Sequence, residues 1–264
     1  MTLVSTMQRQ SIAAEIRLVA PVFYAVTVTF IAAFAICTAL GFIDPRLFNG
    51  VSVWEKPAKF FLSLGVHAAT LGWGLTLLTP EQRAGKGIRR AVQLFAISSV
   101  VEMLWIAGYA AQGSASHFNR TDPIAVAIYP VMGVVAVTLT ALTIYIGWRI
   151  LKSGPGIMQF ATGTGFILSG ILTTIVAGYM SSGTGHSISG DLTDATGLPF
   201  FHWSTTGGDL RVSHFAALHI AQALPLLAWL WPDRRVVAIS AAAALFIVAA
   251  LFAQALAGVP FLRG

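Results

Sequence analysis

Seven stretches of predominantly apolar residues, each long enough to cross a lipid bilayer as a helix, constrain what this chain can fold into. They cover residues 18–42, 57–79, 91–111, 124–150, 157–181, 211–231 and 235–257. A transmembrane helix needs about 20 apolar residues. Charged or turn-forming residues, such as Asp44-Pro45-Arg46 and Pro232-Asp233, separate the stretches. The sequence therefore predicts an all-α polytopic membrane protein, in which residues 1–264 form a single bundle of seven transmembrane helices.

The composition excludes the common soluble classes. Only 10% of the residues are charged and the mean hydropathy is +0.77, whereas a soluble domain carries about 25% charged residues. The net charge of +6 comes largely from basic residues in short loops between the apolar stretches. Such a distribution reports membrane topology, so the expected partner is the lipid bilayer and no nucleic acid. The single cysteine, Cys37, allows no intramolecular disulfide.

The distribution of lysine and arginine also predicts the orientation. One side of the bundle receives Arg9, Arg17, Arg83, Lys86, Arg89, Arg90, Arg149, Lys152, Arg234 and Arg235, and the other receives Arg46, Lys56, Lys59, Arg120, Arg211 and Arg263. Because cytoplasmic loops carry the excess of positive charge, we expect the amino terminus inside and the carboxyl terminus outside. The expected location is the inner membrane of a bacterium.

Polar chemistry is concentrated on the predicted outer side. The acidic residues and histidines there are Asp44, Glu55, Asp122, Asp191, Asp194, Asp209, His117, His186 and His202. The longest loop, residues 182–210, combines glycines and hydroxyls with the apolar run 198–201 and Trp203. This pattern favours a lid folded over the bundle, and the alternative is a solvated loop whose aromatic residues rest in the membrane interface.

Three of the predicted helices carry a polar stripe on one face. At about 100° per residue, each of these sets falls on one side of its helix: Lys56, Lys59, Ser63, His67 and Thr70; Ser98, Glu102, Trp105 and Tyr109; Arg211, His214, His219 and Gln222. At a rise of 1.5 Å per residue, His67, Glu102 and His219 lie roughly 12 to 15 Å below the outer surface. Ionisable side chains at that depth are costly and usually functional, so we expect the three to share a site. The alternative is that they only hold helices together.

The first functional interpretation is a haem b or another redox metal centre. His67 and His219 are the expected axial ligands of a haem, and His214 is a further candidate metal ligand. The residues expected to bind the cofactor are Lys59, Arg120 and Arg211 of the basic rim, together with Trp105 within its span. Glu102 and Tyr109 then serve a quinol pocket as catalytic residues, because quinol oxidation needs a proton acceptor.

A second interpretation starts from Ser63-x-x-x-His67, Glu102 and the late pair His214 and His219. At motif level this set resembles the seven-helix alkaline ceramidase and adiponectin-receptor superfamily. The resemblance implies a zinc-bound water that attacks a lipid amide, with the three histidines as ligands, Ser63 as a supporting hydroxyl and Glu102 as general base. The five-residue separation of His214 and His219 departs from this pattern, because it places the two rings roughly 140° apart.

A third interpretation is a proton-coupled transporter or sensor, with Glu102 and His67 as the protonation switch. Two polar runs just before helices, at residues 53–60 and 206–214, also resemble functional signatures. In them we expect Pro57 in the first helical turn and Asp209 as a helix cap. A ring of ion pairs among Glu55, Lys59, Asp209 and Arg211 is the structural alternative to ligand binding at these runs.

Overall fold

The computed structural model describes residues 11–183, 185–191 and 193–263, so Arg9 lies outside the described residues. The chain is mostly helical. Its helices are α1 (Ile12–Val19), α2 (Pro21–Ile43), α3 (Glu55–Thr76), α4 (Pro80–Ala84), α5 (Lys86–Ala111), α6 (Pro123–Leu151), α7 (Ile157–Ser182), α8 (Leu210–Leu230) and α9 (Arg234–Leu256). Among the described residues, one hairpin of two short strands, β1 (Leu47–Phe48) and β2 (Val51–Ser52), forms the sheet.

Six helices of the described chain are long and apolar enough to cross a membrane: α2, α5, α6, α7, α8 and α9. This confirms the prediction of an all-α membrane protein. The helix predicted as the second span, α3, has 22 residues but is not among the six. Its polar stripe, which includes Lys59 and His67, dilutes its apolar sequence.

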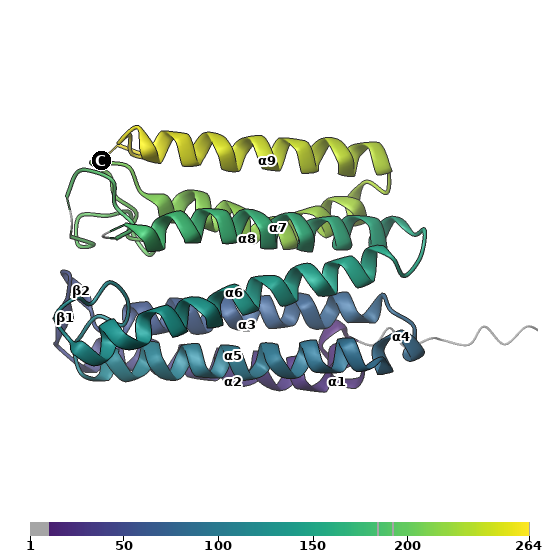
Figure 1. Cartoon of the computed structure of the whole chain (residues 1–264), viewed down its shortest axis with the longest axis horizontal. Helices are drawn as coiled ribbons and strands as arrows, with labels where there is room; N and C mark the ends of the chain where they lie inside the picture. Colours follow the sequence, from purple (N-terminus) through teal and green to yellow (C-terminus); the bar gives the residue numbers. More distant parts are fainter. Residues whose placement is uncertain (1–10, 184, 192, 264) are drawn as a thin grey trace, which may run out of the picture.

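The long helices lie side by side along the longest axis of the molecule (Figure 1). α2 packs against α3, α6 packs against α7, and α8 packs between α7 and α9. The hairpin, the loop after α7 and the carboxyl terminus lie at one end, and α1 and α4 lie at the other (Figure 1). We call the end with the hairpin the outer end, in accordance with the predicted orientation.

Small residues set the packing between α6 and α7. A Cβ atom added at Gly163 would lie 2.6 Å from the Cβ of Leu151, and one added at Gly170 would lie 2.5 Å from Cγ1 of Ile144. Such close approach of backbones is typical of helices that pack in a membrane. Large apolar side chains fill the remaining interior, with Phe23 and Phe95 packed edge to face at 5.3 Å.

The helix starts at the outer end follow the sequence. Pro57 lies in the first turn of α3, and the carboxylate of Asp209 caps α8 by accepting from the backbone N–H of Arg211, so both predictions are confirmed. Asp122 caps α6 in the same way, ahead of Pro123. The Asp209 cap fixes the position from which the polar stripe of α8 begins.

The 182–210 loop is closed on itself by backbone hydrogen bonds. Ile188 N–H donates to Gly208 O at 2.9 Å, and Leu210 N–H donates to His186 O at 2.9 Å. The hairpin turn Asn49-Gly50 docks on this loop, since Asp194 N–H and the Thr193 hydroxyl both donate to Asn49 O. The loop is therefore tied to the segment that precedes α3.

The orientation is testable at the two ends of α7. In a chain with Cys37→Ala, we expect an impermeant thiol reagent to label Ser182→Cys from outside in intact cells. Lys152→Cys, at the opposite end, should react only after the membrane is permeabilised, because the two positions flank one helix of 26 residues. The reverse pattern would contradict the predicted topology.

Candidate functional site

Two groups of polar residues occupy the outer end. The first, here the Glu102 cluster, consists of Lys56, Glu102, Ser116 and His117. The second, here the Arg211 cluster, consists of Asn49, His186, Asp194, His202, Asp209 and Arg211.

His117 is the centre of the Glu102 cluster. Its Nε2 lies 3.2 Å from Oε1 of Glu102, and its Nδ1 lies 3.1 Å from Nζ of Lys56. Nζ of Lys56 also donates to the hydroxyl of Ser116 at 2.8 Å. The side chain of Glu102 is 5% exposed, and its Oε2 is buried without a hydrogen-bond partner in the described part of the chain. The cluster therefore links α3, α5 and the loop between α5 and α6 through a chain of titratable groups.

Neighbouring contacts hold the loop of His117 in place. The indole N–H of Trp105 donates to Ser116 O at 2.7 Å, and the hydroxyl of Tyr109 donates to Oδ2 of Asp122 at 2.8 Å. The imidazole of His117 stacks on Phe60, with ring centroids 6.4 Å apart. Trp105 and Tyr109 thus position the loop, and neither hydrogen-bonds Glu102.

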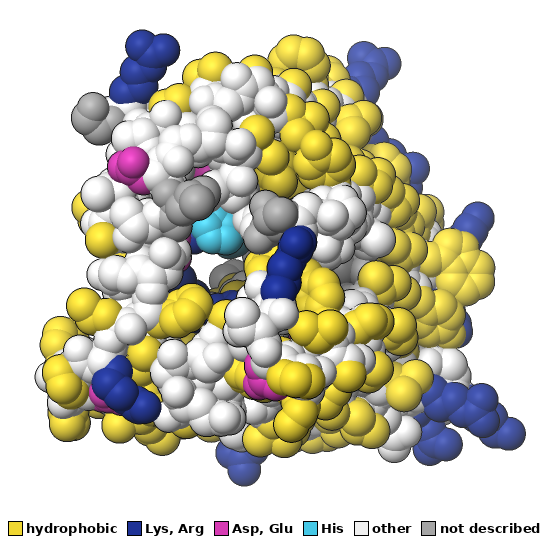
Figure 2. Space-filling view, turned by 60° about the vertical axis from the view of Figure 1, so that its left-hand side comes forward, with side chains coloured by type: hydrophobic (Ala, Val, Ile, Leu, Met, Phe, Trp, Pro, Cys, Tyr) yellow, Lys and Arg dark blue, Asp and Glu magenta, His cyan; other side chains and the backbone are white. Residues whose placement is uncertain are grey.

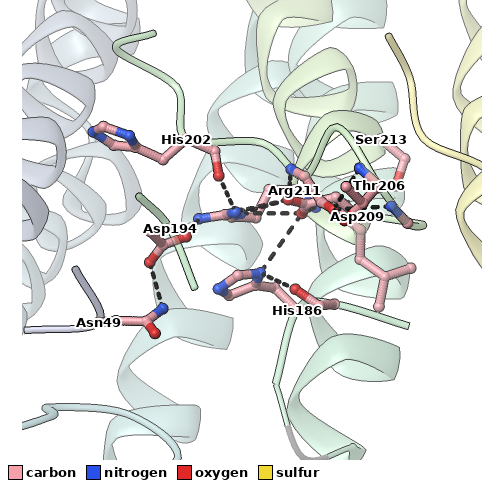
Figure 3. A network of polar contacts seen from close by, with 12 residues as sticks. Asn49, His186, Asp194, His202, Thr206, Asp209, Arg211 and Ser213 are labelled. Carbon is pink, nitrogen blue, oxygen red and sulfur yellow. Dashed lines mark hydrogen bonds and ion pairs between the residues drawn. The ribbon is translucent and has the colours of Figure 1, made fainter. Parts of the chain in front are cut away.

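Arg211 organises the second cluster (Figure 3). Its guanidinium donates to both oxygens of Asp209, to Oδ1 of Asp194 at 2.8 Å and to the carbonyl of His202. Oδ2 of Asp194 accepts from the amide of Asn49 at 2.9 Å, which brings the hairpin into the network. The side chain of Asp209 is fully buried. Because a buried carboxylate is tolerated only when it is paired, we expect the closed loop to depend on Arg211.

Ion pairs connect this loop to α3. Oε1 of Glu55 lies 3.3 Å from Nε2 of His202 and 3.0 Å from Nζ of Lys59. Of the four residues expected to form a ring, Glu55 pairs with Lys59 and Arg211 pairs with Asp209. His202 joins the two pairs, since its ring contacts Glu55 and its carbonyl accepts from Arg211.

The two clusters lie within electrostatic range of each other. Burial lowers the pKa of His186, the charges of Arg211 and Lys56 lower it further, and Asp209 and Asp194 oppose them. Burial also lowers the pKa of His117, with a further contribution from Lys56, against the opposing effect of Glu102. Figure 2 shows the surface of this end, where a hollow opens with a histidine side chain in its wall. In each cluster a partly exposed histidine lies beside a buried acid: His117 is 22% exposed and His186 is 25% exposed.

The backbone is strained around the same end. The non-glycine residues with positive φ in the described chain are Asn49, Phe118, Phe200 and His202, with φ between 54° and 67°. For a bulky residue such as phenylalanine this conformation costs about 1–3 kcal/mol and is frequent at functional sites. Phe118 follows His117 directly, and Phe200 and His202 belong to the 182–210 loop. The strain thus falls on loops that carry the polar clusters.

The three histidines predicted as metal ligands, His67, His214 and His219, have different surroundings. Nε2 of His67 lies 2.9 Å from the hydroxyl of Thr143 on α6. Nδ1 of His219 donates to the carbonyl of Phe215, four residues earlier on α8, at 2.8 Å. Nδ1 of His214 is buried and has no partner within the described residues. No group of three His, Cys, Asp or Glu side chains that could hold a metal ion occurs in the described ranges.

The remaining predicted residues are dispersed. Ser63 is exposed on α3, and Arg120 is exposed and donates to Gly183 O at 3.3 Å. Lys59 lies over the ring of Phe200 in addition to pairing with Glu55. The predicted catalytic residue Glu102 contacts His117. It makes no hydrogen bond or ion pair with Ser63, His67 or His219 within the described residues.

Sequence reasoning missed His117 and Asp194 as site residues. Both lie in loops, where no helical period indicates which way a side chain faces. The available signal was their position: each is a titratable residue on the outer side, beside a hydroxyl-bearing residue or an apolar run.

Comparison with protein-family models, with curated proteins and with solved structures finds no match to this chain.

The Arg211 cluster makes a stability prediction. Arg211→Ala removes the guanidinium that pairs with the buried carboxylate of Asp209, and breaking such a pair costs about 3 kcal/mol. We expect a lower unfolding temperature in detergent and faster proteolysis within residues 185–205. Arg263→Ala, an exposed arginine in the carboxyl-terminal segment, is the matched control. Equal stability of the two variants would show that the Arg211 cluster does not hold the loop.

The two loop histidines make a pH prediction. Because the pKa of His117 and that of His186 are lowered from 6.5 in the folded protein, the unfolded chain takes up protons first as the pH falls. The contribution of these two histidines to the free energy of unfolding is therefore fully present above about pH 6.5. It declines below that pH by at most about 1.4 kcal/mol per pH unit for each histidine. We expect the unfolding temperature to fall toward pH 5, and the double variant His117→Asn, His186→Asn to show a shallower decline. An unchanged slope in this variant would rule the two histidines out as the cause.

Proposed function

We propose that this chain is an integral protein of a bacterial inner membrane that couples proton uptake to the binding of a small polar ligand at its outer end, as a proton-coupled transporter or sensor does. In this proposal α3 also crosses the membrane, which gives seven spans in total, and the amino terminus is inside. The observation that carries the proposal is the chain of contacts from Lys56 through His117 to Glu102.

The contacts of His117 define a route for one proton. In the neutral imidazole, Nε2–H donates to the carboxylate of Glu102 and the lone pair of Nδ1 accepts from the ammonium of Lys56. Transfer of a proton from Lys56 to Nδ1, together with transfer of the Nε2 proton to Glu102, leaves a neutral amine and a carboxylic acid. His117 ends as the opposite neutral tautomer, so no net charge is created. A separated charge pair is thereby replaced by two neutral groups, which suits a site of low dielectric. The neutral amine of Lys56 then takes up one proton from outside, so the net change is the protonation of Glu102.

The surroundings support an exchange with the outside. The side chain of His117 is 22% exposed, whereas that of Glu102 is 5% exposed. His117 is thus the more exposed of the two groups and contacts the buried acid directly. The 182–210 loop, held by Arg211, is the proposed lid over the hollow of Figure 2, because its residues His202 and Asp194 reach Glu55 on α3 and the hairpin.

The haem and zinc interpretations gain no support from these contacts. A haem ligand normally binds through Nε2, and Nε2 of His67 is engaged by Thr143. The zinc interpretation needs Glu102 near the zinc-bound water, and the carboxylate of Glu102 contacts His117 instead. A quinone or a lipid amide as substrate likewise has no contact in its favour.

Infrared difference spectroscopy on the purified protein tests the proposal. In a stepwise titration from alkaline to acidic pH, we expect a carboxylic acid carbonyl band to appear, and Glu102→Gln to remove it. His117→Asn should change the pH at which the band appears, because it breaks the contact of Glu102 with Lys56. Glu81→Gln, at an exposed acid of the opposite end, should leave the band in place.

In sealed proteoliposomes, the same Glu102→Gln variant should lose proton uptake from the outer side, while Glu81→Gln retains it. A wild-type protein in which no carboxylic acid band changes over this range would contradict the proposal. So would a band that survives in Glu102→Gln.

A further inference from the structure

Basic residues occupy the start of α5, at the end of the molecule opposite the hairpin, here called the inner end (Figure 1). Lys86, Arg89 and Arg90 are exposed there, and so is Gln93, one turn further along the helix. These side chains line an open cavity of about 420 Å³, here called the basic hollow. Its volume lies within the range of small-molecule sites, about 300–1,000 Å³. The inner end therefore has a hollow of one sign of charge, distinct from the polar clusters of the outer end.

The cations of the basic hollow have no counter-ion from the described part of the chain. The ion pairs among the described residues all lie at the outer end, so none involves Lys86, Arg89 or Arg90. By contrast, Arg83 and Arg149, at the same end, donate to oxygen atoms of the chain. An anion from outside the chain can supply the partner that the basic hollow lacks.

The position of these cations on the helix also favours an anion. α5 begins at Lys86, and its first turn contains no acidic residue. The N–H groups at the start of a helix carry a partial positive charge, which attracts anions and repels cations. A negative group in the basic hollow is therefore stabilised by the side chains and by the start of the helix together.

An apolar strip continues the same face of α5 toward the middle of the membrane. At about 100° per residue, Ile97, Val100 and Leu104 fall within roughly 40° of Gln93. All three are exposed, and α5 is one of the helices able to cross a membrane. At a rise of 1.5 Å per residue, Gln93 lies roughly 10 Å along the helix from Lys86. A ligand for this face thus has an anionic head, a polar group at the level of Gln93 and an apolar chain beyond it.

We propose that the basic hollow binds the headgroup of an anionic phospholipid in the membrane leaflet at the inner end. The phosphate accepts from the guanidinium groups of Arg89 and Arg90. An ester carbonyl of the lipid accepts from the amide of Gln93, and an acyl chain lies along Ile97 and Leu104. A free phosphate ion makes no use of the apolar strip, whereas a phospholipid matches the whole face. The proposal is independent of the proton-coupled function.

Native mass spectrometry tests the proposal on the full-length protein, released from phosphatidylcholine nanodiscs that contain a minor share of phosphatidylglycerol. We expect one phosphatidylglycerol to be retained per chain in preference to phosphatidylcholine. Arg90→Gln should weaken this retention about fivefold, because one basic residue near the membrane surface is lost. Arg235→Gln is the matched control: it removes an exposed cation of the same end from α9, on the other side of the bundle (Figure 1), and should leave retention unchanged.

Gln93→Leu tests how far the site extends into the membrane. The variant keeps every charge, so attraction of an anion to the basic residues alone is unaffected. Because a hydrogen bond to the lipid ester is lost, we expect retention of phosphatidylglycerol to fall about fivefold. Inorganic phosphate in excess should not displace the lipid from the wild-type protein.

Each contrary outcome overturns a stated part of the proposal. Equal retention of the two lipids by the wild-type protein overturns the ligand class, and displacement by inorganic phosphate shows that the site takes a free anion instead. Equal retention by Arg90→Gln and Arg235→Gln overturns the assigned site, and unchanged retention by Gln93→Leu overturns its depth. Arg90→Gln should keep the carboxylic acid band of Glu102, so failure of this proposal is distinguishable from failure of the proton-coupled function.

Discussion

The cost of placing charge inside an apolar helical bundle is the constraint on which the arrangement of this protein depends. An unpaired ion in such surroundings costs several kcal/mol, and the chain responds by pairing its buried charges at one end. Asp209 is fully buried, and both of its carboxylate oxygens accept hydrogen bonds from the guanidinium of Arg211. Glu102 is buried against His117. The loops at this end are ordered because they supply these partners. Their strained residues, such as Phe118 and His202, are tolerated because the pairs hold the backbone in place.

This constraint also explains why α3 differs from its neighbours. The other long helices present apolar faces outward, as α9 does with Ile239 and Phe246. α3 instead carries Lys56 and Lys59 near its start and His67 and Thr70 further along one face. Lys56 contacts the α5–α6 loop, and Lys59 pairs with the first turn of α3 itself. His67 contacts α6, and Thr70 contacts α8. α3 is thus the helix that contacts the outer clusters at its start and α6 and α8 further along, and the polar side chains that make these contacts account for its lower hydropathy.

The helical period predicted much of this arrangement from the sequence. It identified the polar faces of α3 and α8, and the structure joins these faces at Thr70 and Gln222. Equal depth suggested that His67, Glu102 and His219 would meet, yet depth does not fix the azimuth of a helix around the bundle. Glu102 is turned toward the loop that follows its own helix, where His117 receives it. Loop residues have no period from which their direction can be read, so His117, Asp194 and His202 were beyond prediction as partners, although their types and their side of the membrane were evident.

The two polar regions differ in a way that bears on coupling. At the outer end donors and acceptors are nearly matched, since Arg211 and Lys56 direct their protons at oxygen or nitrogen atoms of the chain. In the deeper polar region between α3 and α8 the balance is shifted toward acceptors, because His67, His219 and Gln222 each keep a lone pair for which the described residues supply no donor. His67 lies on the same face of α3 as Lys56 and Lys59, so this one helix carries side chains of both polar regions. In the function proposed above, a change of charge at the Glu102 cluster acts on the deeper region through α3, without a direct contact between the two.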